Sequence, residues 1–222
     1  MILFLDTAIG ATTIAIKKDN KIFKKVINDN INISQHLVSY VNDILKSANS
    51  KKTDIKLLCF NKGPGNFTSL RVSLAFIKAI AYYLNVPVLE LNSFQVLAIS
   101  TLEINYNSPF VVAVDAKMNE VYFSEYKNYN ELLLKDNSFD LLSNQDFLKK
   151  CYDQKYSNLK LVMSSSDIIN DERKQIIINE VKEIKVENIF KVIENNNLLK
   201  KSNINDVRIL YLRNKVAKKK NE

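Results

Sequence analysis

Two segments of the chain share one layout of strand, aspartate, turn and strand. Residues 2–16 hold a short apolar run that ends at Asp6, a turn and a second β run, and residues 110–126 repeat this order around Asp115. Short apolar runs bounded by turn residues are typical of buried strands. Because the layout recurs near the midpoint of the 222-residue chain, it predicts an α/β fold built from two related halves. The pattern is less regular downstream, so we expect the second half to be reduced.

A glycine-proline-glycine turn leads into the longest helical pattern. The chain has only three glycines, and two of them, Gly63 and Gly65, flank Pro64. Glycine tolerates positive φ and proline fixes φ, so this stretch predicts a tight turn. Asn66 or Thr68 can then cap the helix by accepting from its first free N–H groups. An anion-binding loop is the alternative, but the Gly-Lys-Ser/Thr of a P-loop is absent, so a structural turn is favoured.

Apolar periodicity predicts the remaining elements. Strands are expected at residues 2–5, 12–16, 21–27, 55–60, 86–91, 110–114, 121–126 and 159–163, and helices at 34–49, 67–84, 93–102, 171–178 and 190–199. Ser34 and Ser93 are the expected N-caps of two of these helices.

The helix expected at residues 67–84 carries two apolar stripes. At 100° per residue, one stripe holds Phe67, Leu70, Leu74, Ile77, Ala81 and Leu84, and the other holds Val72, Phe76, Ala79 and Tyr83. A helix that lies on a sheet needs only one apolar stripe. Either the helix expected at 34–49 or a partner subunit covers the second stripe, and the sequence leaves both possibilities open.

The composition argues against several kinds of site. The only histidine is His36, and the two cysteines, Cys59 and Cys151, lie far apart. This leaves no metal-ligand cluster and no Ser–His nucleophile on a Gly-x-Ser-x-Gly turn. We therefore expect no metal and no catalytic residue. We expect a cytoplasmic protein, because the two thiols are isolated and no basic leader begins the sequence. We expect no membrane span, because no run of 18 apolar residues occurs.

The net charge of +8 suggests an acidic partner such as nucleic acid. However, the chain has only four arginines among its 32 basic residues, and phosphate-recognition sites favour arginine for its planar, forked geometry. A general enrichment in lysine explains the charge equally well.

The two aspartate turns resemble the hairpins that hold nucleotide phosphates in actin-like and sugar-kinase-like folds. Asp6 with Thr7, and Asp115 with Lys117, would occupy that position here. Such loops usually carry glycine soon after the aspartate, so that backbone N–H groups can approach phosphate. Threonine, alanine and lysine follow the aspartates in this chain. We therefore expect a degenerate nucleotide site.

Five blocks, in order, resemble the TsaB (YeaZ-like) family of tRNA threonylcarbamoyladenosine biosynthesis proteins. The most specific is residues 63–71, which is similar to the family's Gly-Pro-Gly-Ser-Phe-Thr-Gly-Leu-Arg motif; the others lie at residues 5–8, 35–37, 115–122 and 211–217. The chain departs from the family pattern where Asn66 replaces serine and where Ser69 and Asn119 replace glycine. The changes at Ser69 and Asn119 remove flexible positions from loops that could contact a partner.

The resemblance implies an actin-like (ASKHA, ribonuclease H-like) fold of two domains. Residues 1–105 would form the first domain, with a C-terminal helix at 203–220 folding back on it, and residues 106–222 a smaller second domain. The resemblance also implies a non-catalytic subunit. It would act with a TsaD-like catalytic subunit and a TsaE-like ATPase, which transfer threonylcarbamoyl from threonylcarbamoyl-AMP to N6 of the adenosine beside the anticodon. The chain would form a homodimer alone and reach tRNA only through the complex.

The resemblance further implies a pairing surface on the two long helices of the first domain. Its expected members are His36, Tyr40, Asn66, Phe67, Thr68, Arg71, Val72, Ala75, Phe76, Ala79 and Tyr83. No cofactor is expected except ATP or ADP at the interface with the partner. The alternative function is a nucleotide-binding ATPase or kinase of the same superfold, whereas the single histidine argues against a metallopeptidase.

Overall fold

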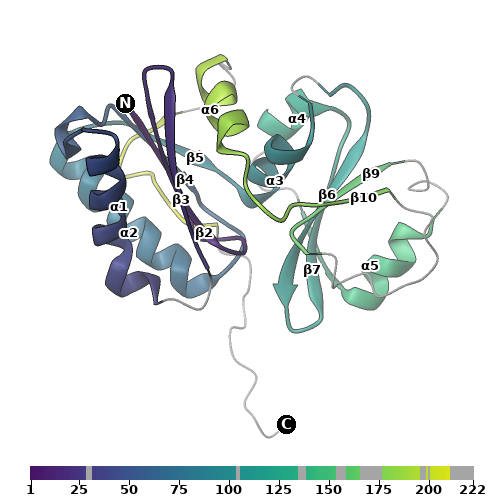
Figure 1. The fold of residues 1–222 in the computed structure, drawn as a ribbon. Coiled ribbons are helices and arrows are strands. Elements are labelled where there is room, and N and C mark those ends of the chain that lie inside the picture. Colours follow the sequence, from purple (N-terminus) through teal and green to yellow (C-terminus); the bar gives the residue numbers. More distant parts are fainter. Residues whose placement is uncertain are drawn as a thin grey trace, which may run out of the picture.

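The structure, a computed structural model, describes residues 1–28, 32–103, 106–134, 139–153, 159–165, 177–195, 199 and 201–210. It contains two β-sheets with helices between them and on their outer faces (Figure 1). We call each sheet with the helices on its outer face a lobe.

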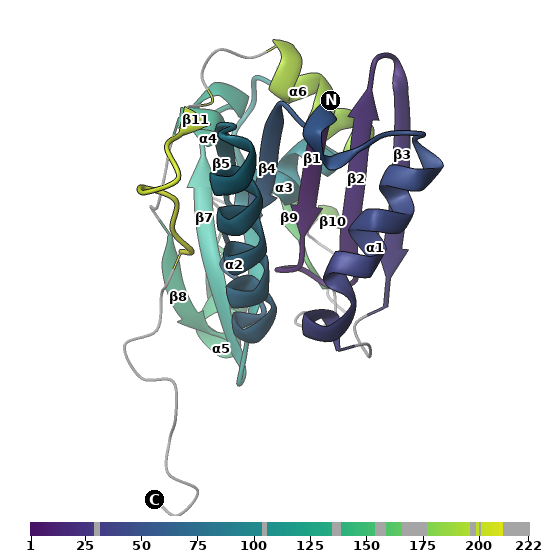
Figure 2. The same ribbon diagram turned by 90° about the vertical axis from the view of Figure 1, so that its left-hand side faces the viewer.

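The first lobe is a six-stranded sheet in the order β11-β5-β4-β1-β2-β3. Its strands are β1 (Ile2–Asp6), β2 (Thr12–Lys18), β3 (Lys21–Ile27), β4 (Leu57–Asn61), β5 (Val88–Leu91) and β11 (Lys201–Ser202). Strands β1, β4 and β5 are parallel, so their carboxyl ends meet at one edge of the sheet. Helices α1 (Ile33–Ser47) and α2 (Phe67–Leu84) lie side by side on its outer face (Figure 2), and a short 3₁₀ turn (Lys52–Asp54) precedes β4.

The second lobe is a five-stranded sheet in the order β10-β9-β6-β7-β8. Its strands are β6 (Phe110–Lys117), β7 (Glu120–Tyr126), β8 (Asp140–Ser143), β9 (Lys160–Met163) and β10 (Ile177–Glu180). Helix α5 (Asn144–Cys151) covers the outer face, where Phe147 and Cys151 pack among residues of β6, β7 and β9. Helices α4 (Tyr129–Leu134) and α6 (Val186–Asn195) lie on the inner side.

Helix α3 (Ser93–Thr101) lies between the two sheets and is shared by both (Figure 1). Eight of its nine residues are buried. One hydrophobic cluster joins this helix to residues of both sheets, such as Phe4 and Leu89 of the first and Phe110 and Val112 of the second. The two lobes therefore have a common core.

Polar contacts also join the first lobe to α6 and to the segment before it. Lys17 of β2 pairs with Glu194 of α6, and Lys24 of β3 pairs with Glu183. The Lys24 ammonium also donates to the backbone carbonyl of Ile184 at 2.8 Å. Exposed ion pairs stabilise a fold only weakly, so we expect the shared core to contribute most of the stability between the lobes.

Most expected strands are confirmed to within two residues, but two expected N-caps are wrong. Asn32 caps α1 by accepting from the Ser34 N–H at 3.3 Å, and Asn92 caps α3 by accepting from the Gln95 N–H at 2.9 Å. Each asparagine has extended backbone just before the helix, and its side-chain oxygen accepts from an N–H of the first turn. The expected caps, Ser34 and Ser93, therefore lie inside the helices. Asn66 is confirmed as the cap of α2.

The second half departs further from expectation. Of the helix expected at 171–178, only residues 177–178 are described, and they belong to β10, which pairs in parallel with β9. The helix expected at 190–199 begins and ends four residues earlier, as α6. Of the helix expected at 203–220, residues 203–210 form a turn and irregular chain, and the remainder lies outside the described residues. This segment packs on the first lobe through the buried side chain of Val207 and the N–H of Leu210, which donates to the Lys62 carbonyl at 2.7 Å.

Helix α2 is long and apolar enough to cross a membrane by length and composition alone. This is weak evidence for a membrane span, because a long helix on a sheet passes the same test. In this fold Leu70, Ser73, Ile77 and Ala81 of α2 are buried.

Candidate functional site

A cavity of about 560 Å³ lies where the two lobes meet. Three segments form most of its wall: the β1–β2 turn, the start of α2, and the beginning of the β6–β7 hairpin. The sequence-predicted residues Thr7, Asn66, Phe67, Asp115 and Lys117 all line this cavity. The two aspartate turns, which lie about half the chain apart, therefore face the same space.

Asp6 does not line the cavity. Its side chain is fully buried, and Oδ1 accepts from the N–H of Ala8 at 2.7 Å and of Ile9 at 3.3 Å. Oδ2 accepts from Nδ2 of Asn61 at 2.8 Å. Burial raises the pKa of Asp6 from 3.8 to about 6, and these three hydrogen bonds limit the rise. The carboxylate thus organises its own turn and the end of the neighbouring strand.

The raised pKa of Asp6 predicts an inverted pH dependence of stability. Because the pKa is higher in the folded chain (about 6) than in the unfolded chain (3.8), the folded state binds the proton more tightly. The Asp6 contribution to the free energy of unfolding should fall by about 3 kcal/mol as pH rises from about 4 to about 6, and stay constant above. Urea unfolding of the native chain and of Asp6→Asn from about pH 4 to about pH 8 measures this contribution as the difference between them.

The Cys59 thiol, whose pKa the charge of Asp6 affects, does not interfere with that measurement. Burial, and then the charge of Asp6, raise the pKa of the Cys59 thiol, so this group stays protonated throughout the range. A difference in stability between the native chain and Asp6→Asn that did not change with pH would contradict the prediction.

Asp115 uses its carboxylate within its own hairpin. Oδ1 accepts from the Lys117 N–H at 2.7 Å, and Oδ2 lies 2.6 Å from the Lys117 ammonium. Lys117, Met118 and Asn119 all have left-handed backbone, with φ of 59°, 56° and 61°, a conformation that is uncommon outside glycine. Among the described residues that line the cavity, Asp115 and Lys117 are the only charged ones, and they pair with each other. This arrangement offers little positive charge to a polyphosphate.

The side of α2 that faces away from the first sheet is only partly covered. Val72 and Phe76 are half-buried and pack in the cluster that α1 shares with the sheet. The exposed residues of α2 form one stripe, Thr68, Arg71, Ala75, Ala79 and Tyr82, with Tyr83 beside it. In the described chain α1 therefore covers one edge of the second apolar stripe, as one of the two alternatives expected, and nothing covers the other edge.

Two aromatic side chains give this uncovered surface its apolar character. Tyr82 is 82% exposed and Tyr83 is 72% exposed. Tyr82 is not among the residues expected on this surface, although the i, i+3, i+4 spacing from Thr68 through Ala79 leads to it. At the other end of the helix, the Arg71 guanidinium lies 3.8 Å from the centre of the Phe67 ring.

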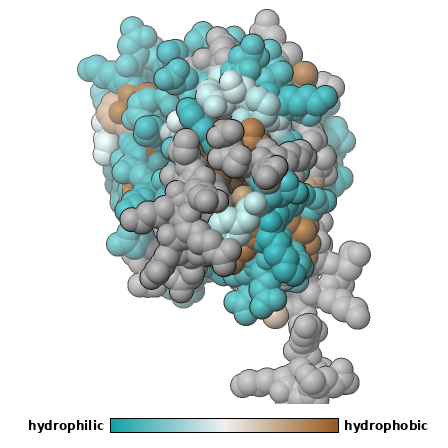
Figure 3. Space-filling view, turned by 90° about the vertical axis from the view of Figure 1, so that its right-hand side faces the viewer, coloured by the Kyte–Doolittle hydropathy of each residue, from teal (hydrophilic) through white to brown (hydrophobic). Residues whose placement is uncertain are grey.

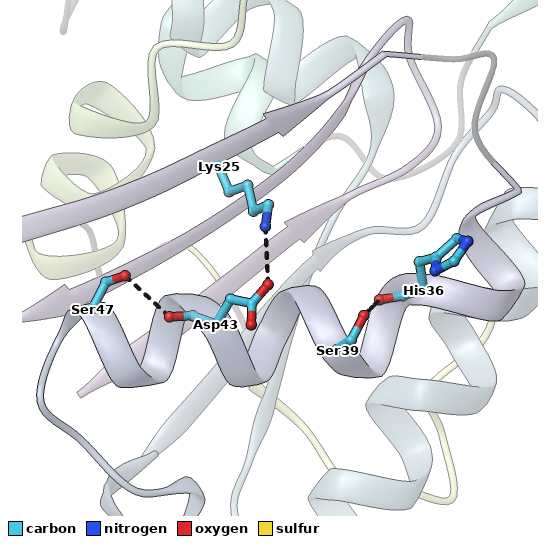
Figure 4. A network of polar contacts seen from close by, with 5 residues as sticks. All are labelled: Lys25, His36, Ser39, Asp43 and Ser47. Atoms are coloured by element: carbon cyan, nitrogen blue, oxygen red, sulfur yellow. Dashed lines mark hydrogen bonds and ion pairs between the residues drawn. The ribbon is translucent and has the colours of Figure 1, made fainter.

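The predicted residues on α1, His36 and Tyr40, lie next to each other. Their ring centres are 5.8 Å apart, and the Lys25 ammonium lies 4.4 Å from the Tyr40 ring centre. Figure 4 shows the polar side of this helix, where Lys25 pairs with Asp43 at 3.1 Å. His36 is exposed and Tyr40 is half-buried, so the exposed part of α1 extends the uncovered surface of α2 with mainly polar groups.

The described chain holds no group of three or more His, Cys, Asp or Glu side chains placed to bind a metal ion. Figure 3 shows the side of the molecule opposite α1 and α2, where hydrophilic residues prevail over the described part of the surface and apolar residues form small, separate patches.

Comparison with known proteins identifies the family. The family model for TsaD, tRNA N6-adenosine threonylcarbamoyltransferase, matches residues 29–200, well over half of the chain. The protein named tRNA threonylcarbamoyladenosine biosynthesis protein TsaB from Buchnera aphidicola (Acyrthosiphon pisum) is 25% identical over 174 residues, which are 76% of each chain. The chain belongs to the TsaD family and, within it, to the TsaB/YeaZ group.

Other members of the TsaB/YeaZ group agree. The protein of the same name from Escherichia coli is 29% identical over 129 residues, which are 57% of this chain and 54% of that one. The alignment thus spans about half the length of the E. coli relative. A Pseudomonas aeruginosa structure, described as similar to peptidase YEAZ, superposes with a TM-score of 0.72 at 18% identity, covering 96% of this chain and 99% of that one. The expected actin-like, ribonuclease H-like fold is confirmed.

Proposed function

We propose that the chain is a non-catalytic subunit of the complex that modifies tRNA with threonylcarbamoyl. It would pair with a TsaD-like catalytic subunit, act together with a TsaE-like ATPase, and reach tRNA through that complex in the cytoplasm. This complex would transfer threonylcarbamoyl from threonylcarbamoyl-AMP to N6 of the adenosine beside the anticodon. Membership in the TsaB/YeaZ group supports this proposal, since relatives carry the name of that biosynthesis.

The uncovered surface of α2 is the observation that carries the proposed role as a partner. Ala75 and Ala79 are small, exposed residues that allow a second helix to approach closely. Tyr82 and Tyr83 are large aromatic side chains of the kind that dominate binding energy in protein interfaces. In this proposal residues 1–105 form the domain that carries the pairing surface, residues 106–222 form the second, and the isolated chain pairs with a second copy through the same surface.

The cavity argues against an independent kinase or ATPase. Its only described charges pair with each other, and Asp6 is buried behind its wall. We therefore assign any bound ATP or ADP to the interface with the partner.

Reconstitution tests the proposal. The purified chain is mixed with TsaD-like and TsaE-like subunits, a source of threonylcarbamoyl-AMP and unmodified tRNA, and threonylcarbamoyladenosine is quantified in digested tRNA. We expect no transfer by the chain alone and a transfer by the TsaD-like subunit that depends on adding it. Transfer by the chain alone, or equal transfer without it, would contradict the proposal. Tight ATP binding by the isolated chain would favour the alternative kinase or ATPase.

A further inference from the structure

Asp6 and Asn61 join two loops that leave the first sheet at the same edge. Asp6 is the last residue of β1 and Asn61 the last residue of the parallel neighbour β4, and both are fully buried. Asn61 donates from Nδ2 to Asp6 and accepts with Oδ1 from the Gly63 N–H at 2.9 Å. One side-chain pair thus connects the β1–β2 turn to the glycine-proline turn before α2.

The backbone of Ala8 makes a second connection between the same loops. Its N–H is held by Asp6 Oδ1, and its carbonyl accepts from the N–H of Asn66, the N-cap of α2, at 3.0 Å. Gly65 passes so close to Ala8 that a Cβ added to it would lie 2.1 Å from the Ala8 carbonyl oxygen. The Ala8 carbonyl shares its peptide with the Ile9 N–H, which donates to Asp6 Oδ1 at 3.3 Å, so the position of Asn66 depends on a peptide that Asp6 orients.

A third strand end closes this network. Ser93, just after β5, places its buried hydroxyl 2.5 Å from the Pro64 carbonyl oxygen and 3.0 Å from Asn61 Oδ1, so its proton can be donated to either. We call Asp6, Asn61 and Ser93, with the backbone groups that they bind, the strand-end network.

The position of the donors and acceptors requires a carboxylate at residue 6. Asn61 already uses Oδ1 to accept from Gly63, so it can offer only its NH₂ to residue 6. An asparagine at position 6 could still accept from Ala8 and Ile9, but its own NH₂ would then face that of Asn61. Burial raises the pKa of the Asp6 carboxyl, so near neutral pH the ionised carboxylate contributes less to the free energy of unfolding than the protonated group does at low pH.

We propose that Asp6 is a positioning residue that, through Asn61 and Ala8, fixes where α2 begins and hence how its uncovered surface is presented. This inference rests on the proposed function only in treating that surface as the one that binds the partner. It assigns the aspartate of the β1–β2 turn to an internal structural contact in place of a bound nucleotide.

An exchange of the two side chains provides the test. The variants are Asp6→Asn, Asn61→Asp and the double variant Asp6→Asn/Asn61→Asp. In the double variant the new amide at position 6 can donate to the new carboxylate at position 61. That carboxylate can still accept from Gly63 and Ser93, and the amide oxygen at position 6 from Ala8 and Ile9. All partners of the strand-end network are then satisfied. In Asp6→Asn alone the NH₂ groups of the two side chains face each other, and in Asn61→Asp alone two carboxylate oxygens face each other.

Two measurements report on the network. Hydrogen exchange of the Ser69 and Leu70 amides, which bond to the N-cap Asn66, reports the order of the α2 start in the isolated chain. Pairing with a TsaD-like subunit reports the presentation of the surface. We expect each single variant to speed exchange and weaken pairing about tenfold, and the double variant to return both to within about threefold of the native chain. Ile16→Val, a core change in β2 outside the network, should lower stability modestly without weakening pairing.

Lack of rescue in the double variant would overturn the inference, and so would native exchange rates in Asp6→Asn. If the single variants do not fold, the inference requires that the double variant does. Failure of the native chain to pair with a TsaD-like subunit would overturn the proposed function instead, because the exchange measurement needs no partner.

Discussion

Replacing Gly65 with alanine should destabilise the fold by at least about 3 kcal/mol, near the upper end of the cost of overpacking a tight site. The new Cβ would lie 2.1 Å from the Ala8 carbonyl oxygen and 2.7 Å from its carbonyl carbon. These are backbone atoms, so no side-chain rotation can relieve the overlap. The β1–β2 turn and the start of α2 would have to move apart and lose the hydrogen bond from the Asn66 N–H to Ala8.

Gly10→Ala is the matched control for this change. Gly10 lies in the β1–β2 turn, the turn that Gly65 approaches, with φ of 54°, and a Cβ there would meet no atom within 4 Å. Only the strain of left-handed backbone remains, which costs about 1–2 kcal/mol. Urea unfolding of both variants separates steric overlap from backbone strain. A Gly65→Ala chain no less stable than Gly10→Ala would show that the loops can separate easily.

Ala79→Glu should weaken pairing with a TsaD-like subunit by about 100-fold or more, because a carboxylate would be buried in the interface without a partner. Ala79 is exposed in the centre of the uncovered stripe of α2, so the free energy of unfolding of the isolated chain should change by less than about 0.5 kcal/mol. Sizing of mixed subunits and a binding titration measure the first effect, and urea unfolding the second. Phe76 suits this test less well, because its side chain is half-buried and packs against the hydrophobic cluster that α1 shares with the first sheet.

Gln145→Glu provides the control for added charge. Gln145 is exposed on α5 of the second lobe, on the other side of the molecule from α2 (Figure 1). The variant should pair like the native chain. Native pairing of Ala79→Glu would exclude the uncovered surface of α2 from the interface, whereas a large loss of stability would place Ala79 in the core.

The sequence predicted the parts of the fold whose patterns are strong and local. Strands β1, β2 and β4 are apolar runs next to turn residues. The glycine-proline turn and the Asn66 cap together predict the start of α2. Prediction was weaker where a choice depended on one or two positions. Asn32 and Asn92 take the caps expected of serines, because an asparagine just upstream already supplies the acceptor.

The elements that were missed are held by contacts distant in sequence. β8 and α5 are short and polar, and β10 forms because residues 177–180 pair with β9. The role of Asp6 was also hidden, because its partner Asn61 lies 55 residues away. Sequence placed both aspartates at the turns correctly but could not show that only Asp115 faces the cavity. Likewise, the apolar character of α2 did not reveal which part of it α1 would cover.

The shared helix α3 has a consequence for the order in which the chain becomes folded during synthesis. After α3 has left the ribosome, one side of it still lacks β6 and α6, and the first sheet lacks β11. The Asn188 amide that donates to the Ile99 carbonyl at 3.1 Å also comes from α6. The shared core cannot be completed before Val192 of α6 has been made, and the core of the first lobe also needs Val207. The nascent first half therefore exposes apolar surface until these residues have been synthesised. During this time a chaperone can bind it, or it can form non-native contacts.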